Sequence, residues 1–112
     1  MTGLTTHVLD TTHGRPAAGV PIRLFRAGAL IFSGITNADG RCPGLLDEAA
    51  LQRGGYRLEF SVADYFRKAG MVLPDPPFLD VIHIDFAIAE LDRHYHVPLL
   101  VSPFGYSTYR GS

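Results

Sequence analysis

The residues of this sequence best suited to proton transfer are its five histidines, because only histidine changes charge near neutral pH without special tuning. His94 and His96 are separated by one residue in a run with strand character, and this spacing directs both rings to one face of a strand. Such a pair can bind zinc, with His7 as a third ligand, but no cysteine or carboxylate stands nearby at a recognisable ligand spacing. The pattern alone leaves open whether these histidines hold a metal or exchange protons.

Three further features gain interest only in combination. His7 lies among threonines in the middle of a strand-like run, and Arg41 directly follows the turn-forming residues 37–40. Taken singly, each is an ordinary surface residue. Residues 109–112 bring a tyrosine and an arginine to a position where chain ends are usually polar and frayed. This composition favours a tail packed against structured residues, and the simpler interpretation is a last edge strand.

Short runs of β-branched and aromatic residues must position these side chains. Twelve glycines and eight prolines punctuate the runs, as is typical of a sandwich or barrel of short strands. The predicted strands cover residues 4–10, 20–26, 30–36, 55–60, 78–88, 95–101 and 105–110. The sequence therefore predicts an all-β fold, a two-sheet β-sandwich of about eight strands with one short α-helix, and a barrel is the second choice.

The one predicted helix runs from Ser61 to about residue 68. Ser61 is a favourable N-cap, and Asp64 three residues later resembles a capping box. Tyr65 and Phe66 share a face with neighbouring apolar residues, and Gly70 is a good stop signal. We expect this helix to be structural cover.

Composition narrows the possible partners and compartments. The 112 residues fit one domain, residues 1–112, and a chain of this size places a deep site in a surface cleft or between subunits. The net charge of −1, with both signs mixed, predicts no nucleic-acid partner. The apolar runs are too short for a membrane span. A single cysteine, Cys42, and no recognisable secretory signal favour the cytoplasm, although a chain whose leader has been removed would look similar.

Several motifs together resemble those of the 5-hydroxyisourate hydrolases in the transthyretin-like family. Residues 109–112 resemble the C-terminal tetrapeptide of these hydrolases, and residues 94–108 resemble the block that precedes it. Transthyretin shares the fold but lacks this tetrapeptide and the histidine pattern. The resemblance covers the whole chain in order, and its other segments are residues 4–10, 14–17, 36–41 and 78–81.

The resemblance implies a substrate, an assembly and a set of site residues. The substrate is 5-hydroxyisourate, whose six-membered ring is opened by hydrolysis to 2-oxo-4-hydroxy-4-carboxy-5-ureidoimidazoline during urate degradation. The assembly is a homotetramer, a dimer of dimers with sites along a channel between subunits, and no metal or cofactor is expected. His94 also matches a common residue of the family, and we assign it a supporting role. The implied catalytic residues are His7, Arg41, His96 and Ser112, and the implied substrate-binding residues are His7, Arg41, Tyr109 and Arg110.

The residue types suit this hydrolysis. We expect His7 and His96 to form an acid–base pair that activates water, which is typically worth roughly 10²–10⁴-fold in rate. Arg41 offers a charged planar fork that orients the substrate and stabilises an oxyanion. Ser112 as a covalent nucleophile is the competing mechanism, although no nucleophile-elbow motif frames it.

Three other functions remain as alternatives at this point. The first is a non-catalytic, transthyretin-like carrier of small ligands, which needs neither His7 nor the 109–112 ending. The second is a metal-dependent hydrolase that uses His7, His94 and His96. The third is a purely structural sandwich module, which leaves the combined motifs unexplained.

Overall fold

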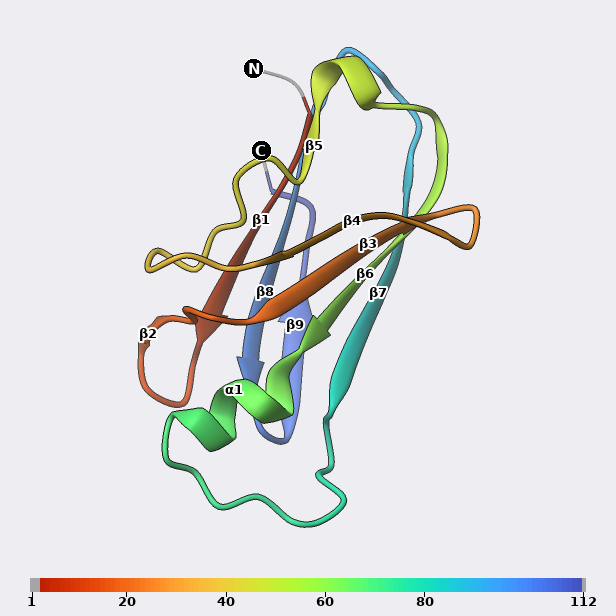
Figure 1. Cartoon of the computed structure of the whole chain (residues 1–112). Helices are drawn as coiled ribbons and strands as arrows, with labels where there is room; N and C mark the ends of the chain where they lie inside the picture. Colours follow the sequence, from red (N-terminus) through yellow and green to blue (C-terminus); the bar gives the residue numbers. More distant parts are fainter. Residues whose placement is uncertain (1–2, 112) are drawn as a thin grey trace.

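The structure, a computed structural model, describes residues 3–111. These residues form two stacked sheets, with one short α-helix at one end of the sandwich and a 3₁₀-helix, η1 (Glu48–Ala50), at the opposite end (Figure 1). One sheet has the order β2-β1-β8-β9, with β5 also paired to β1, and the other has the order β4-β3-β6-β7. The strands are β1 (Gly3–Asp10), β2 (Arg15–Pro16), β3 (Pro21–Arg26), β4 (Ala29–Ile35), β5 (Leu46–Asp47), β6 (Gly54–Ser61), β7 (Val81–Ile88), β8 (His94–Ser102) and β9 (Gly105–Thr108).

The core fills the space between the sheets because side chains alternate along each strand. In β1, Leu4 and Val8 are buried, whereas Thr5 and His7 between them are half-buried on the opposite face. Burying one such aliphatic side chain stabilises the fold by about 1.5–3 kcal/mol. The largest buried side chains of the other strands include Ile22, Leu24, Leu58, Phe60, Ile88 and Leu99.

The pairing of β1 with β8 is parallel, while the other paired strands of the two sheets are antiparallel. Its register sets Thr5 opposite His96 and His7 opposite Pro98. These residues lie on the outer face of the sheet, away from the core. A polar outer face is thus built from two segments about 90 residues apart in the sequence.

The predicted sandwich is confirmed, with nine strands where about eight were expected. The seven predicted ranges do not include β2 and β5, because strands of only two residues are too short for an alternating pattern to reveal. The strand predicted over 78–88 begins at Val81, since residues 78–80 precede the first pairing with β6. The second choice, a barrel, is wrong because the two sheets stay separate.

The helix α1 (Val62–Lys68) is where the sequence predicts it, but its capping differs. The Ser61 side chain makes no cap hydrogen bond. Instead, the backbone N–H groups of Val62 and Ala63 donate to the carbonyl of Asp80 at 3.0 and 3.3 Å. The expected capping box is therefore wrong, because a backbone acceptor from the loop before β7 satisfies these helix-end donors.

A buried carboxylate at the end of β1 fastens the helix to the first sheet. Asp10 is 1% exposed and accepts hydrogen bonds from the Tyr65 hydroxyl and from His13 Nδ1, both at 2.6 Å. Burial by itself raises the pKa of Asp10, but these bonds outweigh it and hold that pKa below its ordinary value. The sequence pattern does not reveal these contacts of Asp10 with His13 and Tyr65.

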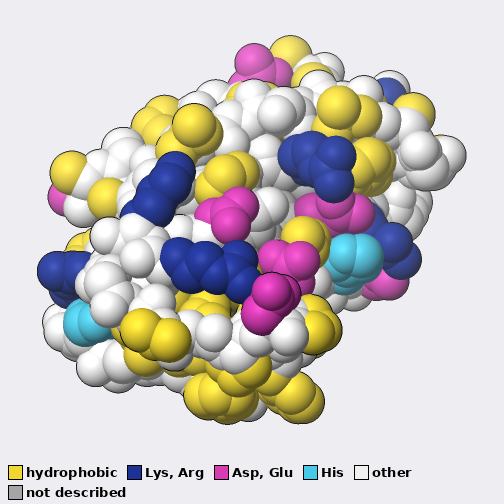
Figure 2. All heavy atoms as spheres, turned by 60° about the horizontal axis from the view of Figure 1, so that its bottom comes forward, with side chains coloured by type: hydrophobic (Ala, Val, Ile, Leu, Met, Phe, Trp, Pro, Cys, Tyr) yellow, Lys and Arg dark blue, Asp and Glu magenta, His cyan; other side chains and the backbone are white. Residues whose placement is uncertain are grey.

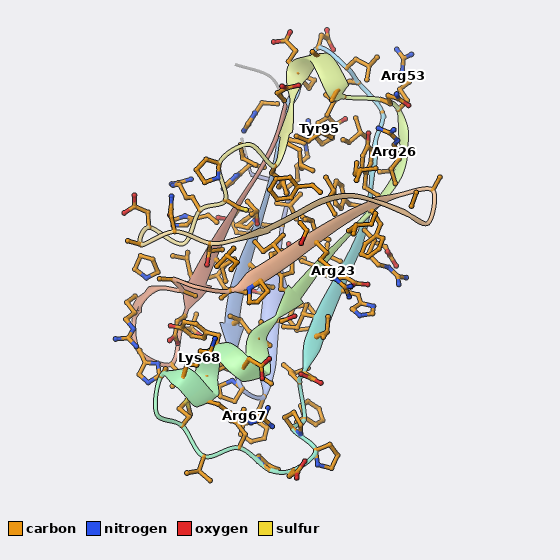
Figure 3. All side chains as sticks on the ribbon, viewed as in Figure 1. Arg23, Arg26, Arg53, Arg67, Lys68 and Tyr95 are labelled. Atoms are coloured by element: carbon orange, nitrogen blue, oxygen red, sulfur yellow. The ribbon has the colours of Figure 1, made fainter. Side chains whose placement is uncertain are left out.

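Charged side chains of both signs lie next to each other on the surface (Figure 2). On the outer face of the second sheet, Arg23 pairs with Glu59 at 2.6 Å and Arg57 with Asp85 at 2.8 Å. Figure 3 labels Arg23 on β3. No helix in the described part of the chain is long and apolar enough to span a membrane.

Candidate active site

A hydroxyl-bridged pair of histidines marks the outer face of β1 and β8. Thr5 Oγ1 lies 2.9 Å from His94 Nε2 and 2.8 Å from His96 Nδ1. The two imidazole rings are nearly parallel, with an angle of 15° between their planes and 6.4 Å between their centres. All three residues are half-buried. The parallel register that puts Thr5 opposite His96 therefore fixes both rings on one surface.

The turn at residues 37–40 brings Arg41 to the same face. The turn is closed by a hydrogen bond from Gly40 N to the Asn37 carbonyl at 2.9 Å, and the Asn37 side chain accepts from Arg41 N at 3.1 Å. Gly40 has φ +75°, and a Cβ at this position would collide with the carbonyl of Val8. Only glycine suits this positive φ and this close approach to the Val8 backbone. The turn thereby places the backbone of Arg41 beside that of His7, and the two residues form an isolated antiparallel β-bridge.

The same turn orients His7. Its Nε2 lies 2.8 Å from the backbone carbonyl of Asp39. A carbonyl oxygen only accepts hydrogen bonds, so Nε2 is the nitrogen that carries the proton. In the neutral ring, Nδ1 of His7 is therefore free of a proton and able to accept one.

The end of the described chain folds onto His96. After β9, which is tied to β8 by a bond from Thr108 Oγ1 to the Pro98 carbonyl at 2.7 Å, Gly111 N donates to the His96 carbonyl at 2.8 Å. A Cβ at Gly111 would lie 2.6 Å from Cδ2 of the His96 ring. The absence of a side chain at this position lets the tail lie directly against the imidazole.

Thr5, Arg41 and the two histidines of β8 border an open hollow of about 430 Å³, a size suited to a small heterocycle, and His7 is not among its lining residues. Two other surface hollows, of about 530 and 550 Å³, are larger, but neither has a histidine among its lining residues. The chemistry of the lining, rather than the volume, therefore selects the site. The hollow is lined by Thr5, Thr6, Arg41, Cys42, Pro43, His94 and His96.

The surroundings of His96 favour its neutral form. Burial lowers the pKa of His96, and the positive charges of Arg41, His94 and His7 lower it further. Burial also raises the pKa of the Cys42 thiol at the edge of the hollow. A neutral imidazole beside a fixed guanidinium can exchange hydrogen bonds with a polar substrate, while a buried neutral thiol is a poor nucleophile.

The structure brings together His7, Arg41 and His96 of the predicted site, and places Tyr109 and Arg110 elsewhere in this chain. The Arg110 guanidinium lies over the ring of Tyr95 at 4.2 Å from its centre, and Tyr95 points between the sheets (Figure 3). Tyr109 and Arg110 line a separate hollow of about 250 Å³. Their contact with substrate stays a prediction, as does the role of Ser112, which lies outside the described residues.

The motif comparison missed Thr5 and the carbonyl of Asp39, which hold the two key rings. The sequence does indicate the position of Thr5, because Thr5 and His7 are two residues apart on β1 and so share one face, as His94 and His96 do on β8. A backbone carbonyl leaves no signal of this kind. Within residues 3–111, no three His, Cys, Asp or Glu side chains are arranged to hold a metal ion.

Two stacked sheets whose outer face carries these side chains define a protein of the transthyretin-like class. Residues 4–111 match the HIUase/Transthyretin family, and the chain belongs to this family. The resemblance inferred from the motifs is thereby confirmed.

The known proteins that this chain resembles include a hydrolase, a synthase and a transthyretin. A 5-hydroxyisourate hydrolase of Caulobacter vibrioides is 54% identical over 116 residues, covering 100% of both chains. The crystal structure of (S)-allantoin synthase superposes with a TM-score of 0.93 and 43% identity over 99% of this chain, which spans 44% of that synthase. Sea bream transthyretin in complex with thyroxine superposes with a TM-score of 0.83 and 32% identity, over 96% of this chain and 93% of the other.

Proposed function

We propose that this chain is a hydrolase that opens the six-membered ring of 5-hydroxyisourate to 2-oxo-4-hydroxy-4-carboxy-5-ureidoimidazoline in urate degradation. The observation that carries the proposal is the outer face of β1 and β8, where Arg41 and His96 border one hollow and His7, which forms a β-bridge with Arg41, lies close enough to lower the pKa of His96. Full-length identity of 54% to a 5-hydroxyisourate hydrolase supports the same substrate. A cytoplasmic location goes with the proposal and is supported by the single, buried cysteine.

The mechanism needs water, a proton acceptor and a stabiliser for charge on oxygen. His7 and His96 form the histidine pair of the proposed site, in which a neutral imidazole accepts the proton of the attacking water. Arg41, with its planar set of donors, orients the flat substrate and stabilises the oxyanion that forms on the attacked carbonyl. The reaction adds one water across a C–N bond, and these side chains supply every group that the step requires.

Tyr109, Arg110 and Ser112 complete the proposed site through the tail. Gly111 already lies against His96, which supports a contact between the tail and the substrate. Arg110 would have to leave the ring of Tyr95 to reach the substrate. Ser112 would hydrogen-bond substrate or water, and an acyl-enzyme on Ser112 is the competing mechanism.

We propose that the working form is a homotetramer, a dimer of dimers. Within the described residues, β9 in one sheet and both β4 and β7 in the other pair on one side only, which leaves free strand edges in both sheets. Phe78 and Phe104 form an exposed aromatic pair, 70% and 62% exposed, with ring centres 6.1 Å apart. A second copy would cover these edges and aromatic rings, and light scattering should report a fourfold mass that Phe104→Asp reduces.

The test of function follows the ultraviolet decay of 5-hydroxyisourate generated with urate oxidase. We expect an excess rate over background that is proportional to the protein and unaffected by a chelator. His96→Ala and deletion of Ser112 should each return the decay close to background without unfolding the protein. His83→Ala is the matched control, because His83 is half-exposed on the other sheet.

Three results would contradict the proposal. A parent protein that binds substrate analogues but does not speed the decay would indicate a carrier instead. Full activity in both His96→Ala and the Ser112 deletion would leave the proposed hydrolase function standing but would refute the proposed site residues. Trapping of an acyl-enzyme would show that Ser112, and not an activated water, is the nucleophile.

A further inference from the structure

The Thr5 hydroxyl joins the two histidines of β8 into one hydrogen-bond chain. Its oxygen is within 3 Å of both His94 Nε2 and His96 Nδ1. A threonine hydroxyl has one proton to donate, so it donates to one of these nitrogens and accepts an N–H from the other. The hydrogen bonds through Thr5 can therefore run in either of two directions. Each direction determines which nitrogen of a neutral His96 carries the proton.

The second nitrogen of His94 decides between the two directions. Nδ1 of His94 is buried and has no hydrogen-bond partner within residues 3–111. If Thr5 donated to His94 Nε2, the proton of the neutral His94 ring would sit on Nδ1 as a buried, unpaired N–H. Buried N–H groups are left unpaired more rarely than acceptors are. The favoured direction is donation from His94 Nε2 to Thr5, and from Thr5 to His96 Nδ1.

We propose that Thr5 and His94 are positioning residues that hold neutral His96 in the form protonated on Nε2. The proposal rests on the hydrolase function inferred above and deepens it. With Nδ1 occupied by the Thr5 hydroxyl, His96 presents an N–H donor to the hollow rather than a base. Such a donor is suited to the oxygen of the attacked carbonyl, where negative charge develops.

His7 is then the base of the reaction. Its Nε2–H is engaged by the Asp39 carbonyl, so Nδ1 is the free acceptor. Water gives a proton to His7 Nδ1 as its oxygen bonds to the substrate carbonyl carbon. The C–N bond then breaks, and the proton passes from His7 to the leaving ring nitrogen. One water has been added, His7 is neutral again, and His96 has kept its proton throughout.

The first test reads the protonated nitrogen directly. Long-range proton–nitrogen correlation spectra of histidine-labelled protein, recorded where the histidines are neutral, distinguish the two ring forms. We expect His94 and His96 both to carry the proton on Nε2 in the parent protein and in Thr5→Ser. Thr5→Val should give a mixture of both forms for His96. A parent His96 protonated on Nδ1, or a Thr5→Val ring unchanged from the parent, overturns the proposal.

The second test is kinetic. Thr5→Val should lower kcat about tenfold, the factor that one hydrogen bond supports, with a smaller change in KM, and Thr5→Ser should restore it. Thr11→Val is the matched control, since the Thr11 hydroxyl bonds the Val101 carbonyl at 3.1 Å, away from both histidines. Equal losses of kcat in Thr5→Val and Thr11→Val would indicate that Thr5 has only a structural role, and they would overturn the proposal.

The two tests separate this inference from the function on which it rests. An inactive parent protein refutes the hydrolase proposal, and the spectra then still decide whether the hydrogen-bond chain exists. An active parent protein with His96 protonated on Nδ1 keeps the hydrolase function and refutes the role of Thr5 and His94.

Discussion

Replacing Gly111 with alanine tests whether the approach of the tail to His96 matters for catalysis. A Cβ at this position would lie 2.6 Å from Cδ2 of His96 and 3.2 Å from its Cβ and Cγ. Carbon atoms pack at about 3.5–4.0 Å, so the ring or the tail must move by roughly 1 Å. Thr5 holds the ring from its other side, and the displacement must break that bond or lift the tail.

The expected loss of activity follows from this displacement. A misplacement of about 1 Å in a catalytic group can cost about 10²-fold in rate, which is about 2.7 kcal/mol of transition-state stabilisation. Stability should change little, because Gly111 does not have a positive φ and follows the last strand. The thermal unfolding midpoint of Gly111→Ala should match that of the parent protein.

The assay is the initial rate of 5-hydroxyisourate decay above background, measured beside the unfolding midpoint. Gly105→Ala is the matched control in the same hairpin, since a Cβ there would meet only Ser102 Oγ, at an ordinary 3.9 Å. Gly105→Ala should keep the parent rate. A folded Gly111→Ala protein with the parent rate, or equal losses in both variants, would refute the reasoning.

Three further predictions concern pH, the buried carboxylate and the turn. The rate should fall at a pH below the ordinary histidine value of about 6.5, where protonation of His96 on Nδ1 removes the acceptor of the Thr5 hydroxyl that holds the ring. Arg41→Gln should move this fall in rate to higher pH, because Arg41 lowers the pKa of His96. Tyr65→Phe should cost about 1.5–3 kcal/mol in urea unfolding at neutral pH, and the difference should shrink below about pH 4, because the lowered pKa of Asp10 stabilises the fold only while the carboxylate is charged. Gly40→Ala should cost about 1–3 kcal/mol in thermal unfolding, since its φ is +75°.

The strands and the main turn could be predicted because local chemistry determines them. In β3, Ile22 and Leu24 alternate with Arg23, and the buried and exposed positions follow that pattern. Gly40 adopts the positive φ that its turn sequence indicates. The capping of α1 could not be predicted, because its acceptor, the carbonyl of Asp80, lies in a segment that approaches only after the chain has folded.

The sequence selects three residues that the structure brings together, but it does not predict their geometry. The motifs select His7, Arg41 and His96, and the structure brings them to one face. No local rule fixes the parallel register of β1 and β8, which sets Thr5 opposite His96. Nor could the sequence predict that Arg110 would lie over Tyr95 rather than face the hollow.

The two faces of β1 separate stability from chemistry. Leu4 and Val8 are within the core, while Thr5 and His7 point outward and contribute little buried apolar area. Substitutions on the outer face should therefore change the reaction much more than the free energy of unfolding. A polar sheet face of this kind exposes the substrate to bulk water unless another surface covers it, because electrostatic stabilisation is strongest in a water-excluded site. The proposed tetramer therefore follows from the demands of the chemistry as well as from the free strand edges.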